Sequence, residues 1–189
     1  MSVPASQDRR NPPSARADRG SSPPDHALEA YILEFDYLCR TLQRLGIREP
    51  DIEDLAHEVF LVLSRKWRDY DPSRPLRPYL FGIAFRIASQ HRRRQLREVP
   101  CDMPEIADPQ ATQPDQAVSV VQARALALNA LERIPLARRA VFMMHELDET
   151  PMRDIAKSLH IPLFTAYSRL RKARQEFELA VAVLQKGSR

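Results

Sequence analysis

A run of ten residues near the C-terminus, TAYSRLRKAR from Thr165 to Arg174, has the composition of a surface that binds a polyanion. It carries four cations and no acid. Hydroxyl and guanidinium groups are the side chains that contact phosphates and the edges of bases. Ala166, Leu170 and Ala173 recur within the run at helical spacing, which predicts a helix with one buried side and one free side. The residues expected to face outward are Thr165, Tyr167, Ser168, Arg169, Arg171 and Lys172.

The segment before this run favours a DNA-binding helix over an ordinary solvated basic helix. TPMRDIAKSLH, over 150–160, has Thr150 as the expected N-cap and Pro151 as the first helical residue. A short helix, a short turn and a longer basic helix form the helix-turn-helix pattern, whose second helix enters the major groove. The turn often holds a left-handed glycine; here it has His160, and histidine adopts that conformation more readily than most residues.

A second basic helix lies in the N-terminal half of the chain. YLFGIAFRIASQHRRR follows RDYDPSRPLRP, a loop with three prolines. Aromatic rings beside a basic surface suit unpaired bases, which stack on the rings while cations hold the backbone. Two plainer roles stay open, since cations near a helix C-terminus also suit its dipole and Trp67 suits core packing. The candidates from this pattern are Trp67, Tyr70, Tyr79, Arg86, Gln90, Arg93 and Arg97.

The acidic stretch DIEDLAHE, over 51–58, is the one place where a metal site of a hydrolytic enzyme could be imagined, because His57 has carboxylates nearby. Acids in the first turn of a helix are explained by capping and by the helix dipole, with Asp51 as the expected N-cap. No HExxH motif is present. The two cysteines, Cys39 and Cys101, form no CxxC motif. We therefore expect no metal, no cofactor and no catalytic residue.

Composition and patterning together predict an all-α protein. Glycine is scarce at four residues, proline is plentiful at 16, and no segment alternates like a strand. No apolar run is long enough to span a membrane, and the polar N-terminus is not a secretory signal. We expect two small helical domains joined by a flexible acidic linker, the second containing the helix-turn-helix. The predicted segments are a disordered tail over 1–25, a helical domain over 26–99, the linker over 100–117 and the second domain over 118–186.

Apolar spacing, together with the glycine and proline residues at helix ends, gives the approximate helix bounds. In the first domain the spacing predicts helices over about 25–45, from Asp51 onward and from about Pro78 onward, with Gly46 as the C-cap of the first. In the second domain it predicts helices over 119–134, 136–147 and 150–160, and a long one over about 163–185.

Taken together, these features resemble a bacterial sigma factor of the extracytoplasmic-function type. DIEDLAHEVFLVLSRKW is similar to the acidic amphipathic helix of that family, and YLFGIAFRIASQHRRR to the helix that follows it. The stretch from ALNALERI to RLRKAR resembles the fourth conserved region, with its T-V-x-S-R-x-x-R-A ending. Each motif is moderately specific, but all of them in this order are highly specific. The departures from the family pattern are at His57, Tyr79, Arg86, Gln90, Phe164 and Ala166.

The resemblance implies a protein that directs promoter-specific transcription initiation and performs no bond chemistry. It implies that the six outward-facing residues of the basic run read the −35 element. It also implies that the aromatic and basic candidates of the first domain, together with Arg74, open and read the −10 element. The implied partners are promoter DNA, the flap of the second-largest subunit of core RNA polymerase, an anti-sigma factor and the clamp helices of the largest subunit. The implied location is the bacterial cytoplasm, or the membrane surface when an anti-sigma partner holds the chain there. The residues that would bind the clamp helices are Asp51, Asp54, His57 and Glu58.

An ordinary helix-turn-helix regulator, acting without replacing the housekeeping sigma factor, is the alternative. It would account for residues 150–177 but would leave the first domain and the acidic linker unexplained. Co-purification with core RNA polymerase and transcription from the core enzyme alone separate the two interpretations.

Overall fold

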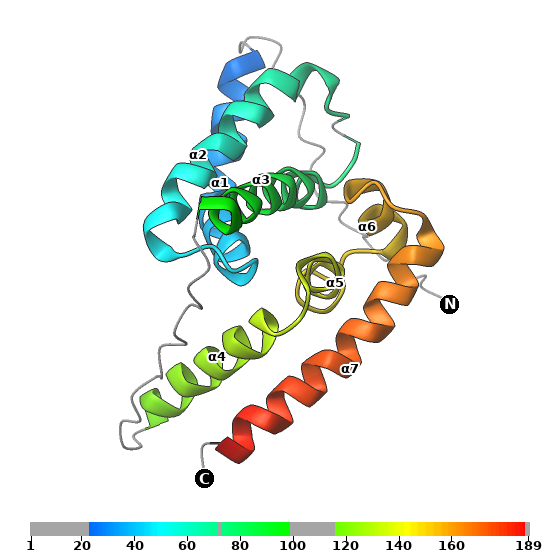
Figure 1. The fold of residues 1–189 in the computed structure, drawn as a ribbon. Coiled ribbons are helices and arrows are strands. Elements are labelled where there is room, and N and C mark those ends of the chain that lie inside the picture. The colour runs from blue at the N-terminus through cyan, green and yellow to red at the C-terminus, as the bar shows by residue number, and fades with distance from the viewer. Residues whose placement is uncertain (1–22, 72, 99–115, 188–189) are drawn as a thin grey trace, which may run out of the picture.

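The computed structural model describes residues 23–71, 73–98 and 116–187, and the regular elements in those ranges are all helical (Figure 1). The predicted all-α fold with two helical regions is confirmed. The predicted N-terminal tail and linker lie outside the described residues, apart from 23–25 and 116–117. The N-terminal region comprises α1 (Pro23–Arg44), α2 (Glu49–Lys66), the single turn η1 (Trp67–Asp69) and α3 (Leu76–Glu98). The C-terminal region comprises α4 (Gln116–Glu132), α5 (Leu136–Phe142), the π-helical turn η2 (Met143–Leu147), α6 (Met152–Ser158) and α7 (Leu163–Gly187).

The core of the N-terminal region is formed by the apolar stripes of three mutually packed helices, α1, α2 and α3. The predicted stripes of α2 and α3 are buried, except that Phe60 is only half-buried. Burying a large apolar side chain contributes about 1.5–3 kcal/mol relative to leaving it exposed, so these stripes determine which sides of the helices face solvent. The buried stripe residues are Ile52, Leu55, Ala56, Val59 and Leu63 on α2 and Leu80, Ile83, Ala84 and Ile87 on α3.

Two helices end in the same backbone motif, one with glycine and one with histidine. After α1, the amide of Ile47 donates to the Leu42 carbonyl (3.1 Å), and Gly46 has φ +84°. After α6, the amide of Ile161 donates to the Ala156 carbonyl (3.0 Å), and His160 has φ +52°. Both are Schellman endings, which need a left-handed residue at the turn. The structure confirms the roles predicted for Gly46 and His160.

The predicted N-caps of α2 and α6 are wrong. Helix α2 begins at Glu49 with Arg48 as N-cap, because Pro50 fits the first turn and starts the helix before Asp51. Helix α6 begins at Met152 with Pro151 as N-cap, and neither cap uses a side-chain hydrogen bond. Thr150 is instead buried, and its amide donates to the Met144 carbonyl at 2.8 Å. That bond follows the π-helical turn η2, which divides the single helix expected over 136–147 into two parts.

The two regions pack directly against each other, so that one buried apolar cluster extends across both. Helix α3 lies beside α6, as Figure 1 also shows. At one point of contact, a Cβ placed on Gly82 would lie 2.6 Å from the Ser158 carbonyl oxygen. Real side chains do not occupy such a position, so any substitution of Gly82 would require the C-terminus of α6 to move away from α3.

A buried arginine joins the regions at a second point. Arg139 on α5 is only 1% exposed, and its guanidinium donates to the carbonyls of Glu132 (2.6 Å), Ile134 (3.1 Å) and Arg44 (3.3 Å). These carbonyls lie at or just after the C-termini of α4 and α1, the negative ends of the helix dipoles. Burial lowers the pKa of Arg139 to about 10, so the side chain remains a cation at neutral pH.

A third contact between the regions links α1 to the segment after η2. The buried hydroxyl of Tyr37 donates to Oδ2 of Asp148 at 2.7 Å, and the Arg77 guanidinium lies 5.1 Å from the centre of the Tyr37 ring. Burial raises the pKa of the Asp148 carboxyl above its ordinary 3.8, and the hydrogen bond from Tyr37 and the cations Arg44 and Arg77 offset part of that rise. Burial also raises the pKa of Tyr37.

Replacing Asp148 with asparagine should remove a pH-dependent loss of stability. Because the folded chain holds the Asp148 proton more tightly than the unfolded chain does, the stability contributed by Asp148 falls as pH rises from about 4 through the folded pKa. The asparagine side chain would still accept the Tyr37 hydrogen bond but would not titrate. We therefore expect the free energy of unfolding of Asp148→Asn, measured in urea, to increase relative to wild type across this pH range.

Tyr37→Phe is the companion variant, because it removes the hydrogen bond that lowers the Asp148 pKa. Without this hydrogen bond, Asp148 in the folded chain should lose its proton at higher pH. The difference in unfolding free energy between Tyr37→Phe and the double variant Tyr37→Phe/Asp148→Asn should therefore keep growing to a higher pH than the difference between wild type and Asp148→Asn does. An equal pH dependence of the unfolding free energy in wild type and Asp148→Asn would contradict the raised pKa of Asp148.

Candidate nucleic-acid interface

The basic run predicted to bind DNA forms the N-terminal part of α7. Its buried side is as expected: Ala166, Leu170 and Ala173 are at most 5% exposed, and Phe177 is half-buried and stacks on the Phe142 ring at 4.9 Å. The chain enters α7 through the His160 turn, and the amide of Ala166 donates to the Pro162 carbonyl at 3.1 Å. Helix α6 packs on α7, which gives the helix-turn-helix geometry.

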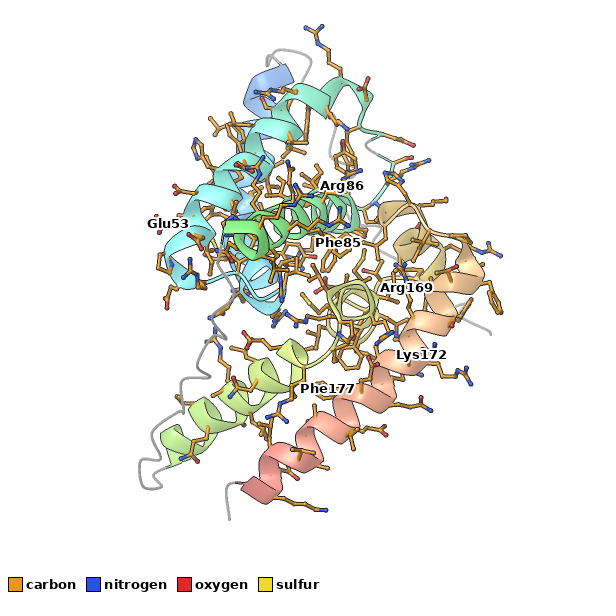
Figure 2. The ribbon with its side chains drawn as sticks, viewed as in Figure 1. Glu53, Phe85, Arg86, Arg169, Lys172 and Phe177 are labelled. Carbon is orange, nitrogen blue, oxygen red and sulfur yellow. The ribbon has the colours of Figure 1, made fainter. Side chains whose placement is uncertain are left out.

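The six predicted −35 residues all lie on this helix, but they are not equally exposed. Tyr167, Arg171 and Lys172 are exposed, and Figure 2 shows Lys172 farther along α7 than Arg169. Thr165, Ser168 and Arg169 are half-buried. The exposed members are therefore the ones that a duplex could contact without any local rearrangement.

The fourth cation of the run has a different role. Arg174 donates to Oε1 of Glu146 through Nε (2.9 Å) and Nη2 (2.6 Å). These hydrogen bonds lower the pKa of Glu146 below its ordinary value. Arg174 thus ties α7 to η2, whereas Arg171 and Lys172 have no such partner among the contacts of the described residues.

The aromatic residues predicted for the −10 element form a stack beside α3. The ring centroids of Trp67 and Tyr70 are 5.3 Å apart, and those of Tyr70 and Tyr79 are 5.1 Å apart. The Tyr70 hydroxyl donates to the Arg74 carbonyl at 2.6 Å, which holds the loop around the rings. Partial burial raises the pKa values of Tyr70 and Tyr79, so both hydroxyls stay protonated at neutral pH.

A cavity of about 320 Å³ opens next to this stack, and both regions line it. Tyr70, Arg74, Tyr79 and Arg86 contribute from the predicted −10 set, whereas Trp67 stacks behind Tyr70 and does not line the cavity. Arg86 lies on the part of α3 close to α6 (Figure 2). The residues that the C-terminal region contributes are Asp154, Lys157, Ser158 and His160.

A direct side-chain contact crosses this cavity. Nη1 of Arg86 lies 2.9 Å from Nε2 of His160. Because a guanidinium can only donate, His160 must accept through Nε2, which requires a neutral ring with its proton on Nδ1. The other predicted −10 residues, Gln90, Arg93 and Arg97, continue along the exposed side of α3 and do not line the cavity.

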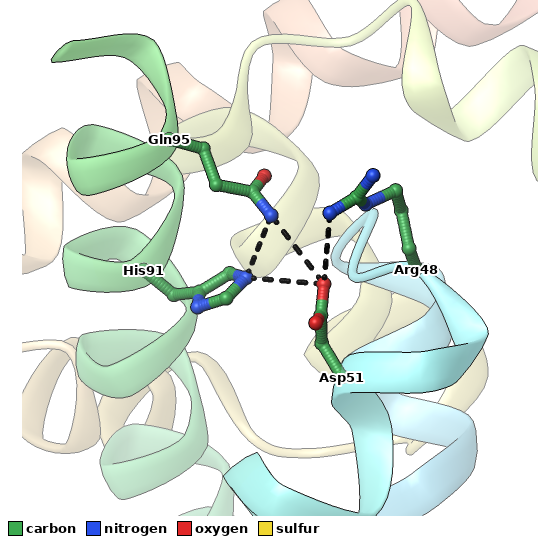
Figure 3. Close-up of polar contacts among 4 residues, drawn as sticks. All are labelled: Arg48, Asp51, His91 and Gln95. Atoms are coloured by element: carbon green, nitrogen blue, oxygen red, sulfur yellow. Dashed lines mark hydrogen bonds and ion pairs between the residues drawn. The ribbon is translucent and has the colours of Figure 1, made fainter. Parts of the chain in front are cut away.

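The residues predicted to bind core polymerase lie on α2 but in different surroundings. Asp54, His57 and Glu58 are exposed, and the His57 ring packs near Tyr31, with 6.4 Å between the ring centroids. Asp51 is engaged within the chain (Figure 3). Its Oδ2 lies 3.5 Å from Arg48 Nη2, 3.4 Å from His91 Nε2 and 3.4 Å from Gln95 Nε2. Asp51 thus joins α2 to α3, which sequence spacing did not reveal.

Several residues of this interface were missed by the sequence analysis. Lys157 and Ser158 line the cavity because α6 packs on α3, a tertiary contact that leaves no local pattern. Arg153 lies exposed one turn before Lys157 on α6. Phe164 was noted only as a departure from the family pattern, yet it is 82% exposed in the first turn of α7. Its size at a solvent-facing position was the available signal.

Neither a metal site nor a membrane span occurs in the described part of the chain. Across 23–71, 73–98 and 116–187, no three side chains of the kinds that bind metals lie close enough to hold an ion. Within the same ranges, no helix is long and apolar enough to cross a membrane.

Comparison with known proteins places both regions in one family. The model of Sigma-70 region 2 matches residues 35–98, and that of Sigma-70, region 4 matches residues 124–177. RNA polymerase sigma factor NccH of Alcaligenes xylosoxydans xylosoxydans is 25% identical over 142 residues, which cover 72% of this chain and 76% of NccH.

Two solved structures share the fold. One is CnrH in complex with the cytosolic domain of CnrY, with a TM-score of 0.60 and 18% identity, covering 84% of this chain and 89% of that one. The other is the sigma factor RpoE in complex with the anti-sigma factor NepR from Bartonella quintana, with a TM-score of 0.64 and 18% identity, covering 84% of this chain and 98% of that one.

The different environments of Arg171 and Arg174 give a matched pair of variants. Arg171→Ala should weaken binding to duplex DNA of random sequence and should reduce the slope of log affinity against log salt by about 1, the value for one phosphate contact. Arg174→Ala should leave that slope unchanged, because its guanidinium already contacts Glu146. Fluorescence anisotropy across a salt series measures both slopes, and equal slopes for the two variants would contradict the assignment.

Proposed function

Since the chain belongs to the sigma-70 family of bacterial RNA polymerase sigma factors, in the extracytoplasmic-function subfamily, we propose how its two regions divide the work of promoter recognition. As a sigma factor it binds core RNA polymerase and directs initiation at specific promoters. The observation that carries this conclusion is the match of region 2 to 35–98 followed by region 4 to 124–177. A simple helix-turn-helix regulator would leave the first of these matches unexplained.

The C-terminal region would read the −35 element through the exposed side of α7, with Arg171 and Lys172 on phosphates or guanine edges. The N-terminal region would open the −10 element. An unpaired base would stack in the Tyr70–Tyr79 cavity while Arg74 and Arg86 hold the backbone. Asp54, His57 and Glu58 would contact the clamp helices of the largest polymerase subunit. Trp67, Gln90, Arg93 and Arg97 would support the −10 contacts.

This division of work requires the two regions to separate. Elements centred 10 and 35 base pairs upstream of the start are about 25 base pairs apart, or about 85 Å at about 3.4 Å per base pair of B-DNA. We call the packed arrangement of the two regions closed. In it, Arg86 Nη1 and His160 Nε2 are 2.9 Å apart, and the first turn of α7 follows His160 closely in sequence. Reading both elements at once would therefore break the Arg86–His160 and Tyr37–Asp148 contacts.

Regulation by an anti-sigma factor is a further part of the proposal. The CnrH and RpoE structures were solved with CnrY and the anti-sigma factor NepR, respectively. This chain offers a cavity of about 380 Å³ between α1, α4 and α7, with arginines around an apolar lining. An amphipathic acidic helix would suit such a surface. The chain would act in the cytoplasm, or at the membrane surface when its partner is anchored there, and would perform no bond chemistry.

Run-off transcription with core polymerase and a genomic fragment library tests the function. We expect transcripts from a small set of fragments that share two elements. Tyr79→Ala should lower the fraction of open complexes, scored by permanganate reactivity, by about tenfold, since stacking on a base is worth about 1–3 kcal/mol. Tyr79→Phe, which keeps the ring, is the control. Absence of any core-dependent transcript would overturn the function, and equal effects of the two variants would overturn the role of Tyr79.

A further inference from the structure

An apolar patch lies at the start of α7, within an otherwise polar DNA-facing surface. Leu163 is 40% exposed, Phe164 82% and Tyr167 56%. A single exposed apolar side chain is ordinary, but three of them within two turns of one helix form a contiguous surface. Phe164 is the most exposed of the three, so it contributes little to the packing of its own region.

Helix geometry places Phe164 in the middle of the outward side. At about 100° per residue, Phe164 lies opposite to Ala166 and Ala173, which are both fully buried. It shares a line with Ser168 and Arg171, four and seven residues further on. A duplex lying along this line would contact both Arg171 and the Phe164 ring.

The surroundings of Phe164 match DNA better than an apolar protein partner. Arg171 and Lys172 lie exposed on the same helix, and Arg153 and Lys157 lie exposed on α6. In helix-turn-helix proteins the first residues of the second helix reach base edges, while the first helix crosses the phosphate backbone. The one apolar group on the base edges of the major groove is the C5-methyl of thymine, which phenylalanine can contact.

We propose that Phe164 reads a thymine methyl in the upstream promoter element and so determines part of the promoter specificity of this chain. The proposal rests on the function proposed above. It adds apolar recognition of a thymine to the contacts made by Arg171 and Lys172.

The test compares thymine with uracil, which lacks only the C5-methyl. Holoenzyme is assembled from core polymerase and the full chain, and initiation is measured on promoter templates in which each upstream-element thymine is replaced singly by uracil. Initiation by wild type should fall about fourfold when uracil replaces one particular thymine or either of two adjacent thymines. This is the effect expected from removing one buried methyl-sized group. Phe164→Ala should lose activity on the thymine template and should no longer distinguish the two bases.

Leu163→Ala is the matched control, because it removes a neighbouring exposed apolar side chain on the same turn. It should keep the wild-type ratio between thymine and uracil templates. The proposal is overturned if no thymine in the upstream element is sensitive, if Phe164→Ala keeps the sensitivity, or if Phe164→Ala lowers core binding without DNA. These results differ from failure of the proposed function, in which wild type would initiate nowhere.

Discussion

The two regions are packed around a buried cation, Arg139, whose charge is satisfied by main-chain carbonyls and not by an ion pair among the described residues. Arg139 is held by main-chain carbonyls at the ends of α4 and α1, and burial lowers its pKa to about 10. Removing a charge from water costs several kcal/mol unless its hydrogen bonds are replaced. Two of its carbonyl partners, Glu132 and Ile134, lie in its own region, and only Arg44 belongs to the other.

Because most of its hydrogen bonds lie within its own region, Arg139 would stay largely satisfied if the two regions separated. When the regions separate, the guanidinium loses one long hydrogen bond at 3.3 Å and gains water, while the bonds within its own region remain. The same holds at Tyr37 and Asp148, where separation would let water solvate a carboxylate whose pKa is raised by burial. The packing of Gly82 on Ser158 requires close contact but supplies no directional bond. The polar contacts between the regions thus fix their geometry, and water can replace each of them when the regions separate.

The closed arrangement affects the two proposed DNA-binding surfaces unequally. Region 4 leaves the outer side of α7 exposed, including Phe164 and Arg171. Region 2 has Arg86 engaged by His160, and its aromatic cavity is partly walled by α6. The closed chain therefore exposes the surface proposed to bind the −35 element, while the surface proposed to bind the −10 element is partly covered.

Local pattern predicted much of this architecture. The apolar stripes of α2 and α3, the left-handed residues Gly46 and His160 and the buried side of α7 all follow from periodicity and backbone preference. The inter-region contacts could not be predicted in this way. Tyr37 and Asp148 are 111 positions apart, and Arg86 and His160 are 74 apart, so no local spacing connects them. For the same reason Asp51, which sequence position makes an attractive N-cap, contacts His91 and Gln95 instead.

The central claim, that the two regions are packed in the free chain and separate on the promoter, is tested most directly by a distance between them. Dyes on Arg94→Cys in α3 and Glu178→Cys in α7, both exposed positions, report it once Cys39 and Cys101 are replaced by serine. Single-molecule energy transfer should give one short, narrow distance distribution in the free chain and a shift of tens of ångströms in the holoenzyme–promoter complex, where the elements are about 85 Å apart. An unchanged distance on the promoter, or a broad and long distribution in the free chain, would contradict it.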